Sequence, residues 1–205
     1  MLSELKFKKF CEKTASNDPV PGGGSVSAMA GAIAASLSEM VANLTLGRKG
    51  FESFDDEMKT IIKESQNLKI LLTEDIDRDS NSYDDVIKAF RMPKESEEDK
   101  IKRSEAIQEA TKHAAMVPLS VAERALEVIY LTEKVVNNGN PNAVTDGAVA
   151  CMMARTAVLG ALYNVKINLS SIKDQDFVNE LSCKVEKIEK KAIDKEKTIL
   201  NNVNL

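Results

Sequence analysis

Two carboxylates stand where the chain pattern predicts buried or restricted surroundings, and proton transfer is the chemistry they suggest. Asp79 comes three residues after Ile76 and four before Tyr83, so the three share one helix face. A carboxylate on an inward face needs a partner or has a raised pKa, and such groups occur both at active sites and in structural pairs. We interpret Asp79 as a candidate acid or base. Four other carboxylates fall mostly off this face, and we expect them to be solvated: Asp75, Asp77, Asp84 and Asp85.

Asp146, the second candidate, follows the helix stop expected at residues 137–141. Thr145 can cap the next helix, and an acid in a first turn is favoured by the helix dipole, so a structural role would suffice. The functional alternative is a carboxylate at the mouth of an apolar helix, placed to exchange a proton. His113 is the only histidine, and for a lone helical histidine we favour a structural role.

A glycine run supplies a candidate binding element. Pro21, Gly22, Gly23, Gly24 and Ser25 predict a flexible loop, with freedom for positive φ, that leads into a helix whose first N–H groups attract an anion. No Lys-Ser/Thr follows the glycines and no strand precedes them, which excludes the phosphate loop and the dinucleotide fingerprint. The structural alternative is that glycine permits close helix packing.

The elements that must position these residues all have helical periodicity, which predicts an all-α fold. We expect a single domain over residues 1–205, built as a bundle of about six long helices. In the first helix Leu5, Phe10 and Cys11 should face inward, and the inward stripe of the third should extend to Phe90. Ser96 and Asp99 should cap the fourth, which Pro118 should break or kink. The expected ranges are 3–15, 26–46, 55–90, 96–137, about 142–165 and 174–203.

Composition excludes several classes of function. The net charge of −4 gives no basic field for nucleic acid. Three widely spaced cysteines and one histidine indicate reduced thiols, a cytoplasmic location and no metal site. Residues 26–46 approach membrane-spanning length, but their serines and Glu39 favour a buried helix over a membrane span. The last helix has near-heptad apolar spacing and should lie outside the bundle or against a partner chain.

Several segments together resemble the cyclodeaminase/cyclohydrolase family of folate one-carbon metabolism. They occur in the family's order: DPVPGGGS (18–25), EMVANLTLG (39–47), RMPK (91–94), AIQEA (106–110), VPL (117–119), NPNAVTD (140–146) and NVKINL (164–169). The family usually has Ser-Asp-Ala where this chain has Thr145, Asp146 and Gly147, so the carboxylate is kept.

The resemblance implies an all-helical, intertwined homodimer that binds a tetrahydrofolate derivative near the subunit interface. We expect a formimidoyltetrahydrofolate cyclodeaminase, which forms 5,10-methenyltetrahydrofolate and ammonia. The alternative is a methenyltetrahydrofolate cyclohydrolase, which adds water to give 10-formyltetrahydrofolate. Neither reaction demands a metal or any cofactor beyond the folate substrate. A non-enzymatic helical scaffold is the further alternative, which folate would not stabilise against heat.

The resemblance also suggests roles for the candidate residues. Asp146 and Asp79 would perform the acid–base steps and stabilise the amidinium cation. Asn43 and Gln108 would bind the pterin edge through their amides, and Tyr83 would stack or donate a proton. Arg48 and Lys49, in the loop over residues 47–54, are otherwise ordinary solvated charges. With residues 22–25 they would receive the glutamate carboxylates of a folate tail, including those of a polyglutamylated folate.

Overall fold

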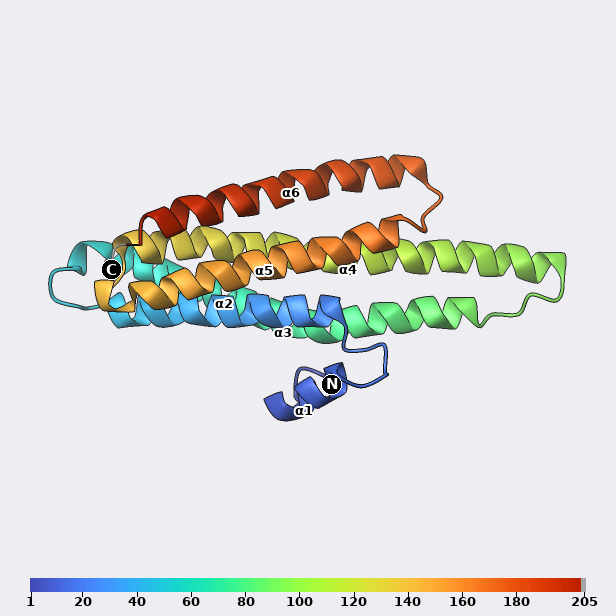
Figure 1. Ribbon diagram of the computed structural model, residues 1–205, viewed down its shortest axis with the longest axis horizontal. Helices are drawn as coiled ribbons and strands as arrows, with labels where there is room; N and C mark the ends of the chain where they lie inside the picture. Colours follow the sequence, from blue (N-terminus) through green and yellow to red (C-terminus); the bar gives the residue numbers. More distant parts are fainter. Residues whose placement is uncertain (204–205) are drawn as a thin grey trace.

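The computed structural model describes residues 1–203, and this part of the chain contains six α-helices and no strand (Figure 1). The all-α prediction is therefore confirmed. The elements are α1 (Phe7–Thr14), α2 (Gly23–Thr45), η1 (Glu52–Phe54), α3 (Asp55–Phe90), α4 (Glu97–Asn138), η2 (Pro141–Ala143), α5 (Val144–Leu169) and α6 (Gln175–Asn201).

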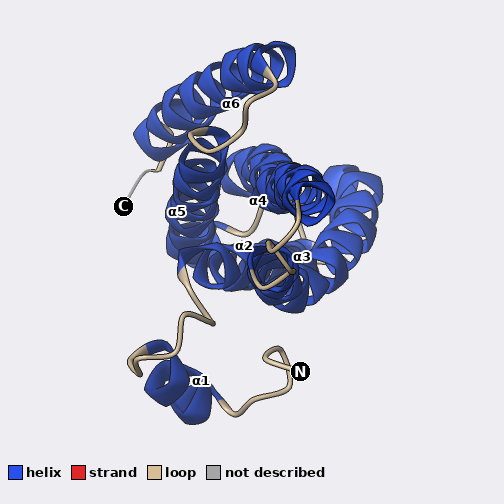
Figure 2. Cartoon of the chain, turned by 90° about the vertical axis from the view of Figure 1, so that its right-hand side faces the viewer, coloured by secondary structure: helices blue, strands red, loops and turns tan. Residues whose placement is uncertain are grey.

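Helices α2, α3, α4 and α5 form a four-helix core, seen end-on in Figure 2. Helix α6 lies outside this core and packs on α4 and α5, while α1 lies on the opposite side (Figure 2). The prediction that the last helix lies outside the bundle is confirmed. Its apolar stripe is buried against the core: Leu181, Val185, Ile188, Ala192 and Ile199.

Helices α2 and α5 run antiparallel and touch closely, because small residues line their contact. A Cβ on Gly160 of α5 would lie 2.4 Å from Ser27 Oγ of α2. One end of the pair brings Gly23 beside Asn164. At the other, the Asn140 N–H donates to Thr45 Oγ1 at 2.8 Å. We call these the Gly23 end and the Thr45 end of the bundle.

Several sequence predictions are corrected at the ends of helices. Helix α1 is shorter than expected. Phe10 is its one buried residue, so the prediction that Cys11 faces inward is wrong. Helix α2 begins at Gly23, so two of the three glycines are helical. Within the described residues positive φ occurs only at Gly47 and Gly50. Phe90 is 51% exposed, since α3 and α4 extend beyond α2 and α5 there (Figure 1).

Of the break or kink expected at Pro118, the break is wrong, because α4 continues through this residue. Proline has no N–H to donate to the carbonyl four residues earlier, which belongs to Ala114. The side chain of Asn168 on α5 supplies the missing donor, with Nδ2 2.8 Å from the Ala114 oxygen. A neighbouring helix thus satisfies the hydrogen bond that the proline removes, and the capping box of Ser96 and Asp99 at the start of α4 is as predicted.

Replacing Asn168 by Ala should lower the free energy of unfolding by about 1–2 kcal/mol, because the Ala114 carbonyl loses its donor. In a Pro118→Ala background the new backbone N–H can reach that carbonyl, and the same replacement should cost less. Urea unfolding of the four chains measures this coupling. Equal costs in the two backgrounds would contradict the assignment of Asn168 as the substitute donor.

Asp75 and Asp77 are not solvated, which corrects a second expectation. Asp75 is fully buried and pairs with Arg124 of α4 and with Arg78, whose NH1 lies 2.5 Å from Oδ1. Asp77 accepts hydrogen bonds from the Leu2 N–H and from the Ser3 N–H and hydroxyl. The helical periodicity shows which face turns inward, but it does not show which residues of other segments will contact a given side chain. Contacts of this kind determine that both carboxylates are paired and at least partly withdrawn from solvent.

Replacing Asp75 by Ala should destabilise the protein by about 3–5 kcal/mol, because Arg124 would be left half-buried without its counter-charge. Arg78 is 44% exposed at its side chain, so Arg78→Ala should cost much less and serves as the matched control. Thermal and urea unfolding give both values. Similar losses for the two variants would show that the Asp75–Arg124 pair is not the dominant contact.

Candidate functional site

A cavity of about 370 Å³, which we call the Asp79 cavity, opens at the Gly23 end of the bundle. Its walls come from the connection between α1 and α2, the first turn of α2, α3, and the last turns of α5. Pro19, Asp79, Tyr83, Asn164 and Asn168 are among the residues that line it. The volume falls in the range of small-molecule sites, and a titratable group lies inside it.

The Asp79 carboxylate lies at the first turn of α2, where it accepts a hydrogen bond from the Ser25 hydroxyl, and the N-cap residue of α2, Gly22, provides no side-chain cap. The first N–H groups of a helix lack intrahelical partners, and a carboxylate there is favoured by the dipole. The carboxylate approaches so closely that a Cβ on Gly24 would lie 2.0 Å from Asp79 Oδ1. The glycine run therefore serves close approach rather than positive φ.

Burial raises the pKa of Asp79, an effect opposed by hydrogen bonds from the side chain and backbone of Ser25 and reinforced by the nearby Asp75 charge. The Ser25 hydroxyl lies 2.9 Å from Asp79 Oδ2 and 3.0 Å from the Ile76 carbonyl oxygen. It can donate to the carboxylate when Asp79 is ionised. It can turn to the carbonyl, and accept from the acid, when Asp79 is protonated. Both protonation states are thus accommodated without moving the backbone.

A Gly24→Ala variant should lose about 2 kcal/mol of stability, because the new methyl group overlaps the carboxylate of Asp79. It should also lose turnover, since Asp79 must move to make room. The double variant with Asp79→Ala removes the overlapping atoms, and its unfolding free energy should exceed that of Gly24→Ala alone. Additive losses in this cycle would rule out the contact as the cause.

Two asparagines of the site were not predicted from the sequence. Asn164 donates through Nδ2 to the Gly160 carbonyl at 2.9 Å, and Asn168 donates to the carbonyls of Ala114 and Asn164. Their Oδ1 atoms accept no hydrogen bond from any residue in 1–203, so both are available to a ligand's N–H groups. Polar residues four apart on an otherwise apolar helix were the signal that could have identified them.

The structure brings only part of the predicted site together. Gly22, Gly23, Gly24, Asp79 and Tyr83 line the cavity, while Pro21 and Ser25 adjoin it along the chain. Gln108 instead binds the connection between α5 and α6, with Nε2 donating to Ser171 O and Oε1 accepting from Lys173 N. His113 is exposed on α4. These placements leave the roles of the predicted residues as predictions.

Asp146, Asn43, Arg48 and Lys49 lie at the Thr45 end, away from the cavity. Asn164 follows Asp146 by 18 residues on α5, which corresponds to about 27 Å at 1.5 Å per residue. Asp146 is half-buried in the first turn of α5. Thr145 is not the cap, because it lies inside α5, whose N-cap position is Ala143 and has no side-chain cap. Asn140 caps the preceding turn, η2, by accepting from the Asn142 N–H.

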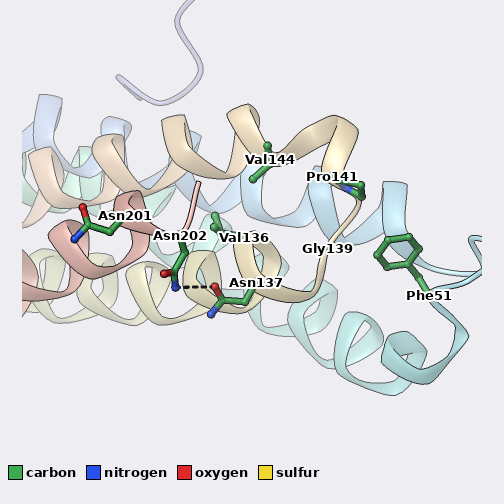
Figure 3. A pocket seen from close by; sticks show the side chains of 8 residues that line it. All are labelled: Phe51, Val136, Asn137, Gly139, Pro141, Val144, Asn201 and Asn202. Atoms are coloured by element: carbon green, nitrogen blue, oxygen red, sulfur yellow. Dashed lines mark hydrogen bonds between the residues drawn. The ribbon is translucent and has the colours of Figure 1, made fainter. Parts of the chain in front are cut away.

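A second cavity, of about 500 Å³, lies at the Thr45 end and contains none of the predicted residues (Figure 3). Valine, proline and asparagine side chains line it, and Asn202 donates to Asn137 across it at 3.1 Å. It holds no acid or base, so the cavity at the Gly23 end is the better candidate for chemistry. Within residues 1–203 no group of three or more His, Cys, Asp or Glu side chains is arranged to hold a metal ion.

A helical bundle that holds a carboxyl group with a raised pKa and two free amide oxygens in a small end cavity has the layout of a small helical enzyme. The sequence profile of the formiminotransferase-cyclodeaminase family matches residues 6–187. The chain therefore belongs to the formiminotransferase-cyclodeaminase family, as the sequence motifs predicted.

Individual relatives carry two different names. A methenyltetrahydrofolate cyclohydrolase of Methylorubrum extorquens is 36% identical over 88% of this chain and 86% of that protein. The formimidoyltransferase-cyclodeaminase of Sus scrofa is 34% identical over 86% of this chain, which spans only 32% of that longer protein. The crystal structure of formiminotetrahydrofolate cyclodeaminase from Thermotoga maritima matches with a TM-score of 0.90 at 29% identity, over 99% of this chain and 98% of that one.

Proposed function

We propose that the chain is a formimidoyltetrahydrofolate cyclodeaminase, in which N10 attacks the formimidoyl carbon on N5 and ammonia leaves to give 5,10-methenyltetrahydrofolate. The observation that carries an enzymatic function is Asp79, a half-buried carboxyl group that lines the cavity at the Gly23 end, with the Ser25 hydroxyl 2.9 Å from its Oδ2 and a pKa raised by burial. The choice of the cyclodeaminase over the cyclohydrolase is supported by the Thermotoga maritima cyclodeaminase, whose structure matches 99% of this chain. Ammonia departs from the tetrahedral intermediate only after its nitrogen gains a proton, and Asp79 would donate that proton. Proton transfer is sufficient, so the proposal includes no cofactor beyond the folate.

The remaining groups of the cavity suit the folate ring. The Oδ1 atoms of Asn164 and Asn168 would accept from the pterin N–H groups, and Tyr83 would lie against its aromatic part. Ser25 would hold Asp79 in place through the proton transfer, because it has a partner for either protonation state. N10 must lose a proton as it attacks, which calls for a base. A second carboxylate would serve, and Asp79 is the one carboxylate among the described residues that line the cavity of one chain.

We propose that a second copy supplies that carboxylate as Asp146. Helix α2 and the segment Pro141–Leu169 are long and apolar enough to span a membrane, but 61% and 50% of their most apolar windows are buried in the bundle, as in core helices. The residues that remain exposed form an apolar face on α2 and α5: Ile33, Met40, Leu44, Val149, Met152, Tyr163 and Ile167. A face of this kind favours association with another protein surface over exposure to water.

An isologous pairing of this face joins the two ends of the bundle. If α5 packs antiparallel on its own copy about Thr156, residue 146 of one chain lies opposite residue 166 of the other. Residue 166 is next to Ile167, which lines the cavity. The Asp146 of one chain would then reach the Asp79 cavity of the other, and each homodimer would have two complete sites.

The direct test offers purified protein 5-formimidoyltetrahydrofolate and 5,10-methenyltetrahydrofolate separately, and follows the methenyl absorbance. The cyclodeaminase should produce absorbance from the first compound. The second candidate, the cyclohydrolase, is favoured by the full-length relative from Methylorubrum, and would accelerate the loss of absorbance from the second compound. If neither rate changes and neither compound raises the melting temperature, the enzyme proposal fails and a scaffold role remains.

A further inference from the structure

A second hollow adjoins the Asp79 cavity and is rich in cationic side chains. It has a volume of about 310 Å³ and is lined by Pro19, Tyr83, Asp84, Ile87, Lys88 and Arg91. Pro19 and Tyr83 line both hollows, so the two lie side by side along α3. A ligand held at Asp79 can therefore extend past Tyr83 without leaving the protein surface.

The cations of this hollow are available to an anion. The Arg91 side chain is exposed and makes no ion pair or hydrogen bond with any residue of the described chain. Lys88 pairs with Asp85 at 2.8 Å, which uses one of its three N–H donors. The lining contains two cations against the single carboxylate of Asp84. Guanidinium and ammonium groups are the usual partners of carboxylates.

We propose that this hollow, which we call the Lys88–Arg91 subsite, binds the carboxylates at the far end of the substrate, while the reacting ring lies at Asp79. The proposal rests on the proposed function for the identity of the ring. Lys88 follows Asp79 by nine residues, or about 13 Å along α3. The subsite therefore takes an elongated ligand whose aromatic middle crosses Tyr83 and whose end carries negative charge, as the glutamate tail of a folate does.

This assignment differs from the one that the sequence suggested. Arg48 and Lys49 lie at the Thr45 end, so they can approach this cavity only from a second copy. Lys88 and Arg91 reach it from the chain that provides Asp79. The two assignments therefore make different predictions for matched pairs of variants.

The test compares a folate with its glutamate dimethyl ester, which keeps the ring and removes both negative charges. For the Lys88→Ala/Arg91→Ala double variant, KM for the folate substrate that the wild type converts should rise about tenfold, because charge-assisted contacts to the non-reacting end are lost. The kcat of this variant should stay within about twofold of the wild-type value. KM for the diester should be the same in the wild type and this variant. Lys63→Ala/Lys190→Ala removes two exposed lysines without ion pairs elsewhere, and should leave both values unchanged.

Three results would overturn the subsite. These are an unchanged KM in the double variant, an equal rise for folate and diester, or a rise confined to Arg48→Ala/Lys49→Ala. Equilibrium binding of tetrahydrofolate and its diester by calorimetry repeats the comparison without turnover. A wild-type chain that binds tetrahydrofolate but processes neither substrate would contradict the proposed function, and the binding comparison would still decide the subsite.

Discussion

Replacing Asp79 by Asn is expected to lower kcat by about a thousandfold, because the amide cannot pass a proton to the leaving nitrogen. The cavity should remain intact, since an asparagine oxygen still accepts from Ser25 at 2.9 Å. Steady-state rates with the substrate that the wild type accepts give the effect. Glu74→Gln, an exposed carboxylate on the same helix, is the control and should keep full activity.

The same variant should be more stable than the wild type at neutral pH. Burial raises the folded-state pKa of Asp79, so ionising this carboxyl disfavours the folded state once the pH exceeds its unfolded value. The asparagine never ionises. The gain in melting temperature should therefore be largest at neutral pH and shrink as the pH falls through the raised pKa. A variant that loses both activity and stability at neutral pH would point to a structural role for Asp79 instead.

Mixing two inactive variants is expected to restore activity if each site uses both copies. Asp79→Asn and Asp146→Asn homodimers should each be inactive. A mixed dimer has one cavity with both wild-type carboxylates and one with neither. After denaturation and refolding of an equal mixture, about half of the dimers are mixed, so about a quarter of the wild-type activity should return.

The matched control refolds each variant alone, which should give no recovery. A chain that carries both substitutions should also stay inactive after refolding, because each of its sites lacks both carboxylates. If Asp146→Asn is fully active by itself, Asp146 is not the second carboxylate. If both single variants are inactive and the mixture stays inactive although mixed dimers form, the two residues do not act in one shared site.

The sequence was sufficient for the fold class, because apolar residues that recur every three to four positions specify an amphipathic helix. The bounds predicted for α3, 55–90, match the structure, and Ser96 was correctly identified as the cap of α4. Both rest on local interactions, which neighbours in the chain determine. The start of α2 was misplaced, because helix propensity disfavours glycine. Propensity contains no information on the Asp79 carboxylate, which approaches Gly24 so closely that only glycine fits there.

Pro118 illustrates the same limit. Reasoning from the local sequence predicted a break or a kink, since a proline removes a hydrogen bond from its own helix. The missing donor comes from Asn168, 50 residues away in sequence, and nothing near Pro118 indicates it. Asp75 likewise follows the polar pattern of a solvated face, and only the approach of Arg124 from α4 makes its burial tolerable.

For the site, the sequence alone determined the types of residue that matter: a carboxylate on an apolar stripe, a glycine run, and an ordered set of motifs that identified the family. Those features follow from periodicity and composition, which are properties of the chain. Only the tertiary structure decided which residues share a cavity. Asp79 meets the first turn of α2 because α2 and α3 pack together. Asp146 is remote from this cavity because α5 is one continuous helix of about 39 Å and Asp146 lies at its opposite end. Distances between helices depend on how their faces pack, and that information lies in no single segment.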